Sequence, residues 1–128
     1  MNNTKTLRGR FAPSPSGRMH LGNAWSALLA WLSVRSRGGV MVLRLEDLDP
    51  DRCKRPLCDG VEEDLRWLGL DWDEGGSAGG PEFYQSQRSE IYRAALEQLE
   101  QQGLAIAGAA TAEEAEADGT ILVHVIPG

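Results

Sequence analysis

The chain has 128 residues, of which 41% are hydrophobic, and a formal net charge of −6. This length allows one domain with a modest core, and the hydrophobic share together with four tryptophans excludes a disordered chain. No stretch approaches the ~20 apolar residues that span a bilayer, and the polar N-terminus lacks a signal-peptide pattern. We therefore expect a cytoplasmic protein with no membrane partner.

The charges are divided unevenly along the chain. Residues 1–44 carry seven basic side chains and no acidic one, whereas all 19 acidic residues lie from Glu46 onward. A basic first third indicates an anionic ligand such as a nucleotide or an RNA backbone, with uneven surface charge as the alternative. The acidic remainder argues against a protein that binds nucleic acid over its whole surface.

The first elements in chain order form a strand, a helix and a strand. Residues 7–12 predict a short strand that ends before a proline, and residues 13–20 (PSPSGRMH) must form a loop. The apolar spacing from Leu21 predicts a helix that stops at Gly38-Gly39, and residues 40–46 (VMVLRLE) predict a buried strand. This order predicts an α/β fold with parallel strands and crossover helices.

The second part of the chain is predicted to be mainly helical. Residues 46–56 are predicted to form a loop, and a helix follows from about Asp59 to Leu68 with Asp59 as its cap and Glu62 and Glu63 in its first turn. Residues 69–82 are glycine-rich and predict a mobile loop. A helix from Ser89 to Gln102, one or two helical turns at 111–118 and a strand at 120–126 complete the prediction.

The loop at 13–20 has the features of an anion-binding cradle. The first amides of a helix lack partners and carry positive partial charge, and small residues such as Gly17 and Gly22 permit a phosphate to approach the backbone. His20 lies one residue before the helix, where it can donate to a phosphate oxygen. The alternative for His20 is a plain helix cap. Neither the Walker pattern nor GxGxxG is present.

Three stretches together resemble a known family. RFAPSPSGRMHLGNA (10–24), LRLEDLDPDR (43–52) and YQSQR (84–88) resemble, in order and spacing, the motifs of class I glutamyl-tRNA synthetases and their shorter glutamyl-queuosine tRNA(Asp) relatives. The resemblance covers about residues 8–104 and is mildly closer to the short relatives. It implies the first half of a Rossmann-like catalytic domain at 1–104, followed at 105–128 by the start of the connecting, acceptor-binding insertion.

The resemblance implies an activity and a set of site residues. In this family glutamate attacks the α-phosphate of ATP, and the glutamyl group then passes to tRNA. The positions that match the family's catalytic element are His20, Gly22 and Asn23, and those that match its glutamate-binding positions are Arg10, Ser14 and Glu46. The implied ATP-binding positions are Ala12, Pro13, Ser14, Gly17, His20, Gly22 and Asn23. Mg²⁺ is expected through the ATP phosphates and not through protein ligands.

Several of these side chains also have interpretations that involve no ligand. Arg10 fits an exposed strand arginine, and Glu46 fits a helix cap or a salt bridge to Arg52. Asp47 and Asp49 follow a strand, where acidic residues often form turns, and we do not expect them to bind metal. Two groups are expected to be structural. They are the cysteines Cys53 and Cys58 and the core tryptophans Trp25, Trp31 and Trp67; the role of Trp72 stays open.

The chain also departs from the family pattern. Lysines occur only at positions 5 and 54, so the family's second ATP motif, of the Lys-Met-Ser-Lys-Ser type, is absent, as are the tyrosine and arginine that complete the glutamate pocket. No cysteine cluster follows Gly103, so no zinc is expected. We therefore expect an incomplete domain with weak ATP binding, little activity alone, and self-association or a second chain as partner. The alternatives are a catalytically silent nucleotide-binding or split-partner fragment, or another nucleotidyl-transfer protein of the superfamily, against which RLEDLDP argues.

Overall fold

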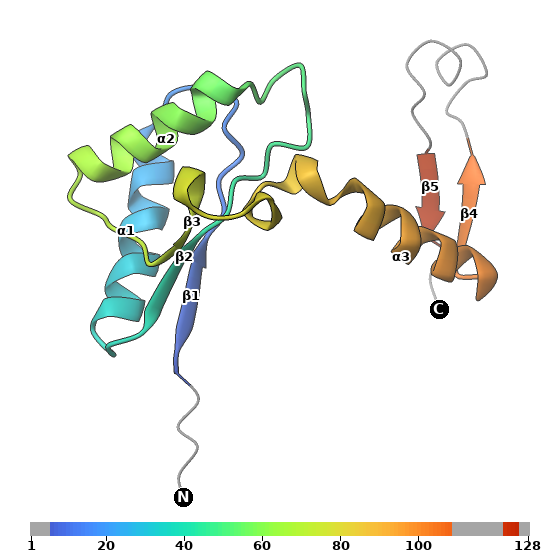
Figure 1. Cartoon of the computed structure of the whole chain (residues 1–128), viewed down its shortest axis with the longest axis horizontal. Coiled ribbons are helices and arrows are strands. Elements are labelled where there is room, and N and C mark those ends of the chain that lie inside the picture. Colours follow the sequence, from blue (N-terminus) through green and yellow to red (C-terminus); the bar gives the residue numbers. More distant parts are fainter. Residues whose placement is uncertain (1–5, 109–121, 126–128) are drawn as a thin grey trace, which may run out of the picture. The chain divides into compact units, whose positions relative to one another are not determined.

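The computed structural model describes residues 6–108 and 122–125. Contacts divide the chain into two units, residues 1–88 and 89–128, which are described separately. The first unit contains a parallel sheet with two α-helices, and the second contains a helix and an antiparallel strand pair (Figure 1). The expected domain boundary at 104/105 stays a prediction. In the described part of the chain, no helix has the length and apolar content that crossing a bilayer requires.

The predicted strand–helix–strand unit is confirmed. β1 (Arg8–Phe11) and β2 (Val40–Leu43) pair in parallel and are connected by α1 (Leu21–Arg35). After α1 the chain turns at Gly38, whose φ of 63° is a left-handed conformation that glycine adopts without strain. Because β1 pairs with β2 and α1 connects them, the end of β1 and the start of α1 lie at fixed positions on either side of the loop 12–20.

The predicted start of the second helix is wrong. α2 (Arg55–Trp67) begins before Asp59, with Lys54 at the cap position and Pro56 in the first turn. Proline suits that turn because its missing N–H would have no helical partner there. Asp59 therefore lies inside the helix, where its carboxylate pairs with Arg55 at 3.5 Å.

The glycine-rich segment 69–82 contains a short strand and 3₁₀ turns that the sequence did not predict, and its mobility stays a prediction. β3 (Glu74–Gly75) pairs in parallel with β2, and the sheet order is β1-β2-β3. Three short 3₁₀ turns follow, namely η1 (Gly76–Ala78), η2 (Pro81–Phe83) and η3 (Gln85–Arg88). A strand of two residues is too short to give the alternation by which sequence reasoning detects strands.

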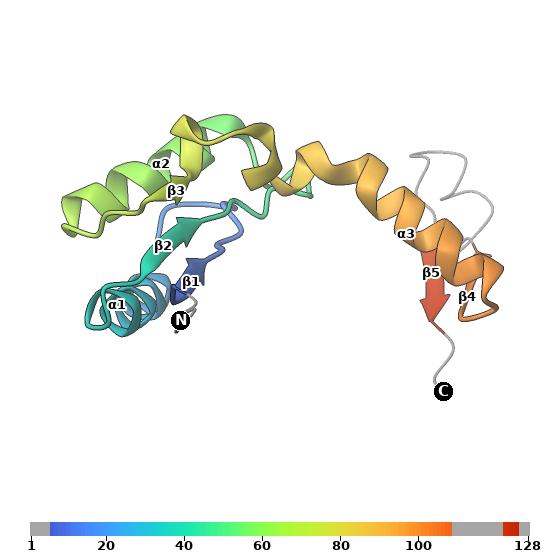
Figure 2. The ribbon, with the colours of Figure 1, turned by 60° about the horizontal axis from the view of Figure 1, so that its bottom comes forward.

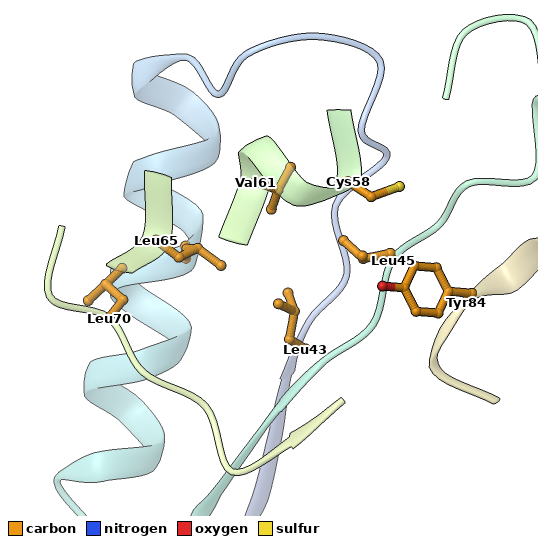
Figure 3. Packing of buried hydrophobic residues seen from close by; sticks show 8 residues of the cluster. Leu43, Leu45, Cys58, Val61, Leu65, Leu70 and Tyr84 are labelled. Atoms are coloured by element: carbon orange, nitrogen blue, oxygen red, sulfur yellow. The ribbon is translucent and has the colours of Figure 1, made fainter. Parts of the chain in front are cut away.

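The core of the first unit lies between the sheet and its two helices. Figure 3 shows Leu43 and Leu45 below Val61 of α2, with Leu65 of the same helix to one side. Ala27 of α1 belongs to the same buried cluster. Both helices thus pack on one set of buried residues, and burial of each such leucine stabilises the fold by about 1.5–3 kcal/mol.

Only one of the three tryptophans expected in the core packs against it. Trp31 is partly buried against the cluster, as predicted. Trp25 and Trp67 are 59% and 87% exposed, so the expectation is wrong for these two. For Trp25 the reason is that α1 is apolar around most of its circumference, while only the side with Ala27 and Val34 is buried. Trp67 is the last residue of α2 and lies off the buried side of that helix, which carries Cys58, Val61, Glu62 and Leu65.

Polar contacts join the end of α1 to the segment before β3. The guanidinium of Arg35 donates to Asp71 at 2.9 Å and to Asp73 at 2.6 Å, and Trp31 Nε1 donates to Asp71 at 2.8 Å. Asp73 also accepts from the backbone N–H of Met41 at 2.7 Å. These contacts fix the register of β3 beside β2.

The second unit contains α3 (Ser89–Gln101), β4 (Ala105–Gly108) and β5 (Leu122–Val125) (Figure 2). The helix predicted at 89–102 and the strand predicted at 120–126 are confirmed, whereas β4, which pairs antiparallel with β5, is a new element. The helical turns predicted at 111–118 lie outside the described residues.

Candidate nucleotide and amino-acid site

The loop between β1 and α1 is held at both ends by segments that are distant in sequence. At its start, the carbonyl of Pro13 accepts from the backbone N–H of Glu46 at 2.9 Å. At its end, Arg18 pairs with Asp64 of α2, and the backbone N–H of Met19 donates to the same carboxylate at 3.4 Å. The loop is therefore pre-formed by the fold, as an anion cradle requires.

His20 caps the N-terminus of α1. Its Nδ1 accepts from the backbone N–H groups of Gly22 at 3.1 Å and Asn23 at 3.4 Å, and the Asn23 side chain accepts from the His20 N–H at 3.4 Å. A ring nitrogen that accepts carries no hydrogen, so the proton of the neutral ring lies on Nε2. The exposed imidazole therefore presents Nε2–H as a donor, and the cap function considered from the sequence is present as well.

The two glycines of the loop and helix start have different roles. A Cβ on Gly22 would lie 3.1 Å from Cε1 and 3.2 Å from Nδ1 of His20, so glycine makes room for the capping ring. A Cβ on Gly17 would meet no atom within 4 Å. Close approach of a ligand thus remains a reason for Gly17, while the capping ring gives Gly22 a reason of its own.

Two of the three predicted glutamate-binding residues share a pocket. Ser14 and Glu46 line a cavity of about 240 Å³. Its other lining residues are Ser16, Leu48, Asp49, Arg52, Cys53 and Gln85. Arg10 is exposed on β1 and is not part of this lining, and His20 lines a separate cavity of about 280 Å³. The structure thus brings Ser14 and Glu46 together and leaves Arg10 and His20 apart from them.

The pocket contains unpaired groups of both charges. Within the described residues, neither the half-buried carboxylate of Glu46 nor the guanidinium of Arg52 has a hydrogen-bonding or ionic partner, although both line the cavity. The salt bridge considered between these two residues is therefore absent from the described part of the chain. A carboxylate and a guanidinium in one pocket can bind the ammonium and a carboxylate of an amino acid.

The two aspartates after β2 have structural partners. Asp49 Oδ1 accepts from the backbone N–H groups of Asp51 at 3.0 Å and Arg52 at 3.2 Å, which confirms it as a turn former. Both oxygens of Asp47 accept from Ser86, one from the backbone N–H at 3.0 Å and one from the hydroxyl at 2.8 Å. Among residues 6–108 and 122–125, no group of three or more His, Cys, Asp or Glu side chains could hold a metal ion.

Sequence reasoning missed three residues that shape the site. Arg52 and Gln85 line the pocket, and Asp64 holds the end of the loop. Arg52 and Gln85 each lie in a stretch that carried the family resemblance, so a signal for them existed. Asp64 gave no such signal, because its role depends on the packing of α2 beside α1.

Comparison with known proteins finds a matching family model and similar sequences. A family model described as "tRNA synthetases class I (E and Q), catalytic domain" matches residues 6–121. The chain is 54% identical over 95 residues to a glutamyl-Q tRNA(Asp) synthetase of Nitratidesulfovibrio vulgaris and 47% identical over 112 residues to a glutamate–tRNA ligase of an Anaeromyxobacter species. These matches cover 73% and 86% of this chain, but only 29% and 24% of the relatives.

A solved structure gives the same result. A glutamate-tRNA synthetase from Elizabethkingia anophelis superposes with a TM-score of 0.76 at 35% identity, over 92% of this chain and 26% of that protein. The expected α/β fold, with parallel strands and crossover helices as in the first half of a Rossmann-like domain, is confirmed. The chain spans about a quarter of the length of these relatives.

Proposed function

The chain belongs to the class I tRNA synthetases for glutamate and glutamine, and on that premise we propose that it binds ATP and L-glutamate to form glutamyl-adenylate. In the proposed step, a carboxylate oxygen of glutamate bonds to the α-phosphorus of ATP, and the bond to the leaving pyrophosphate breaks. The glutamyl group then passes to tRNA. Because the substrate supplies the nucleophile, the step requires no nucleophilic side chain.

The single observation that carries this proposal is the geometry of His20. Its Nδ1 is occupied by two backbone amides of α1, so Nε2–H faces outward at the positive end of that helix. Donors placed where negative charge develops on phosphate oxygens lower the barrier to phosphoryl chemistry. Gly22 and Asn23 are proposed to take part through their backbone N–H groups. When a phosphate oxygen displaces the imidazole of His20 from these two N–H groups, it accepts their hydrogen bonds instead.

The pocket beside the loop supports the choice of an amino-acid substrate. We propose that Glu46 binds the α-ammonium of glutamate and that Ser14 adds a hydroxyl, since both line the cavity. Arg10 is proposed to bind a carboxylate from the adjoining end of β1, and Ala12, Pro13 and Gly17 to face the nucleotide. Mg²⁺ enters with the ATP phosphates. The absence of zinc and a cytoplasmic location stay predictions.

The proposal is tested by titrating the ¹⁵N-labelled 128-residue chain with Mg·ATP. We expect the His20 ring and the amides of Gly22 and Asn23 to shift. His20→Ser keeps a capping oxygen but has no second polar group to replace the outward Nε2–H, so ATP affinity should fall about tenfold while stability changes little. His124→Ala is the control, because it removes the second histidine of the chain. Unmoved resonances at His20, Gly22 and Asn23 under saturating ATP would contradict the proposal.

The catalytic part of the proposal is tested by ATP–pyrophosphate exchange. We expect exchange that depends on glutamate and that falls about 10²–10³-fold in His20→Ala. Equal exchange with aspartate would contradict the assigned substrate. Exchange that stays absent while ATP binds would assign the chain to nucleotide binding without catalysis, the alternative considered from the sequence.

The acceptor RNA is proposed from the relatives. The glutamyl-Q tRNA(Asp) synthetases of Nitratidesulfovibrio vulgaris and Symbiobacterium thermophilum are 54% and 56% identical to this chain over 95 and 99 residues, against 47% over 112 residues and 50% over 102 residues for glutamate–tRNA ligases of two Anaeromyxobacter strains. This difference supports tRNA(Asp) as the acceptor. Transfer of labelled glutamate to tRNA(Asp) and to tRNA(Glu), measured in parallel, distinguishes the two activities.

A further inference from the structure

The segment 83–86 runs beside the extension of β2 and carries one side chain into the pocket. Leu45 donates its backbone N–H to the carbonyl of Phe83 at 2.9 Å, and Gln85 donates its own to the carbonyl of Leu45 at 2.9 Å. Leu45 and Tyr84 form a parallel bridge. This pairing places the side chain of Gln85 in the cavity that Glu46 also lines.

Asp47 holds this segment by hydrogen bonds to both oxygens of its carboxylate. Oδ1 accepts from the backbone N–H of Ser86 at 3.0 Å, and Oδ2 accepts from its hydroxyl at 2.8 Å. Asp47 and Ser86 are both half-buried, and they lie directly after Glu46 and Gln85 in the sequence. Two hydrogen bonds from adjacent donors to one carboxylate fix both the position and the orientation of the backbone that carries Gln85.

The carboxamide of Gln85 has no hydrogen-bonding partner in the described part of the chain, although the side chain is half-buried. An amide in such a place offers an oxygen that accepts from an ammonium and an NH₂ group that donates to a carboxylate. Glutamate carries both groups. The neighbouring Glu46 supplies only acceptors, and Gln85 adds a neutral donor to the guanidinium of Arg52 that lines the same pocket.

We propose that Gln85 is a further glutamate-binding residue and that Asp47 and Ser86 are positioning residues that hold it in the pocket. This inference rests on the proposed function, because it takes glutamate as the ligand. In this proposal Asp47 acts by holding Ser86, and its negative charge does not act on the substrate directly.

The contact of Gln85 is tested by titrating L-glutamate, at saturating Mg·ATP, into the ¹⁵N-labelled 128-residue chain. We expect the side-chain NH₂ resonances of Gln85, assigned by their loss in Gln85→Glu, to shift with the backbone amides of Ser14 and Glu46. Gln85→Ala should weaken glutamate binding about tenfold, the effect of one lost hydrogen bond to a charged group. Gln98→Ala is the matched control, because Gln98 is exposed on α3 and lies outside this pocket.

The positioning role is tested by two substitutions at Asp47. Asp47→Asn keeps an oxygen for the Ser86 N–H and gains a donor for its hydroxyl, so glutamate affinity should stay close to that of the unmodified chain. Asp47→Ala should lower affinity as much as Gln85→Ala, and the double variant should lose no more than either single one. Equal losses in Asp47→Asn and Asp47→Ala would overturn the positioning role, because they would mean that the charge acts directly.

The outcomes separate this inference from the proposed function. If Ser14 and Glu46 shift with glutamate while Gln85 stays unmoved, only the new residue is overturned. If no pocket resonance shifts with glutamate, the proposed substrate and the Gln85 contact both fail. The positioning role of Asp47 and Ser86 is then tested on the ligand-free chain. If the side-chain resonances of Gln85 do not move in Asp47→Ala, that positioning role is overturned.

Discussion

Glu62 of α2 accepts hydrogen bonds from both the backbone N–H and the hydroxyl of Ser77, the latter at 2.8 Å. Its side chain also pairs with Arg66 at 2.9 Å, and the residue is only 2% exposed. The sequence predicted Glu62 in the first turn of this helix, and that prediction is wrong because α2 begins at Arg55. Glu62 instead ties the middle of α2 to the turn after β3.

We expect Glu62→Ala to destabilise the first unit by about 1–3 kcal/mol, because it removes the buried acceptor of two hydrogen bonds from Ser77 and the ion pair with Arg66. Urea unfolding followed by tryptophan fluorescence measures this change. Glu63→Ala is the matched control, since Glu63 is exposed on the same helix and should change stability by less than about 0.5 kcal/mol. Equal effects of the two substitutions would contradict the structural role of Glu62.

The acid stability of the chain should depend on Arg35. The hydrogen bond from Trp31 and then that from Arg35 lower the pKa of Asp71, and the hydrogen bond from Arg35 lowers the pKa of Asp73. A lowered carboxyl pKa stabilises the fold above the unfolded value of about 4, and this contribution disappears as pH falls through the native value. In Arg35→Gln, unfolding midpoints between about pH 5 and pH 2.5 should therefore decline less steeply.

The comparison for this prediction is Arg37→Gln. Arg37 is exposed and forms no ion pair with any described residue. Its removal should leave the slope of stability against pH unchanged. A slope that is the same in Arg35→Gln and in the unmodified chain would show that the two aspartates do not carry the acid response.

The two cysteines should differ in reactivity. Burial raises the pKa of the Cys58 thiol to about 11, with the negative charge of Asp47 adding to the effect, and the residue is 1% exposed. Burial also raises the pKa of Cys53, but this residue is only half-buried and lines the pocket. Iodoacetamide at about pH 8 should therefore modify Cys53 first and reach Cys58 only when the fold opens, as peptide mass spectrometry will detect.

The same pKa shift predicts a loss of stability at high pH. An unfolded thiol ionises near pH 8.5, whereas native Cys58 stays protonated to about pH 11. The raised pKa stabilises the fold below the unfolded value, and the contribution is lost as pH rises between the two values. Cys58→Ala should flatten this alkaline decline. Faster labelling of Cys58 than of Cys53 in the native chain would contradict both predictions.

The exposed side of α1 should cause self-association. Positions 21–34 contain no charged residue. Leu21, Trp25, Leu29 and Leu32 are 85%, 59%, 49% and 48% exposed. A helix that is apolar on all sides is normally covered, so we expect the average mass in sedimentation equilibrium to rise with concentration. Leu29→Gln should reduce this rise, and Leu104→Gln, at a residue 42% exposed in the second unit, should not. A constant monomer mass would contradict the prediction.

The sequence by itself determined the first parallel unit and the loop that joins β1 to α1. Alternation, helical spacing and the glycines after the helix are local signals, because each depends on residues within one or two turns of the chain. The same stretches carried the resemblance through which the family was identified. Local pattern therefore sufficed for β1, α1 and β2 and for the motif between the first two.

Only the tertiary structure decided which side chains meet. Asp47 and Ser86 are 39 residues apart, and their contact, which places Gln85 beside Glu46, depends on the pairing of two segments that have no mutual signal in the sequence. The same holds for the burial of Glu62 and for the exposure of Trp25, because periodicity identifies an apolar helix but not the side that faces the sheet. Long-range packing, which no local window contains, set these positions.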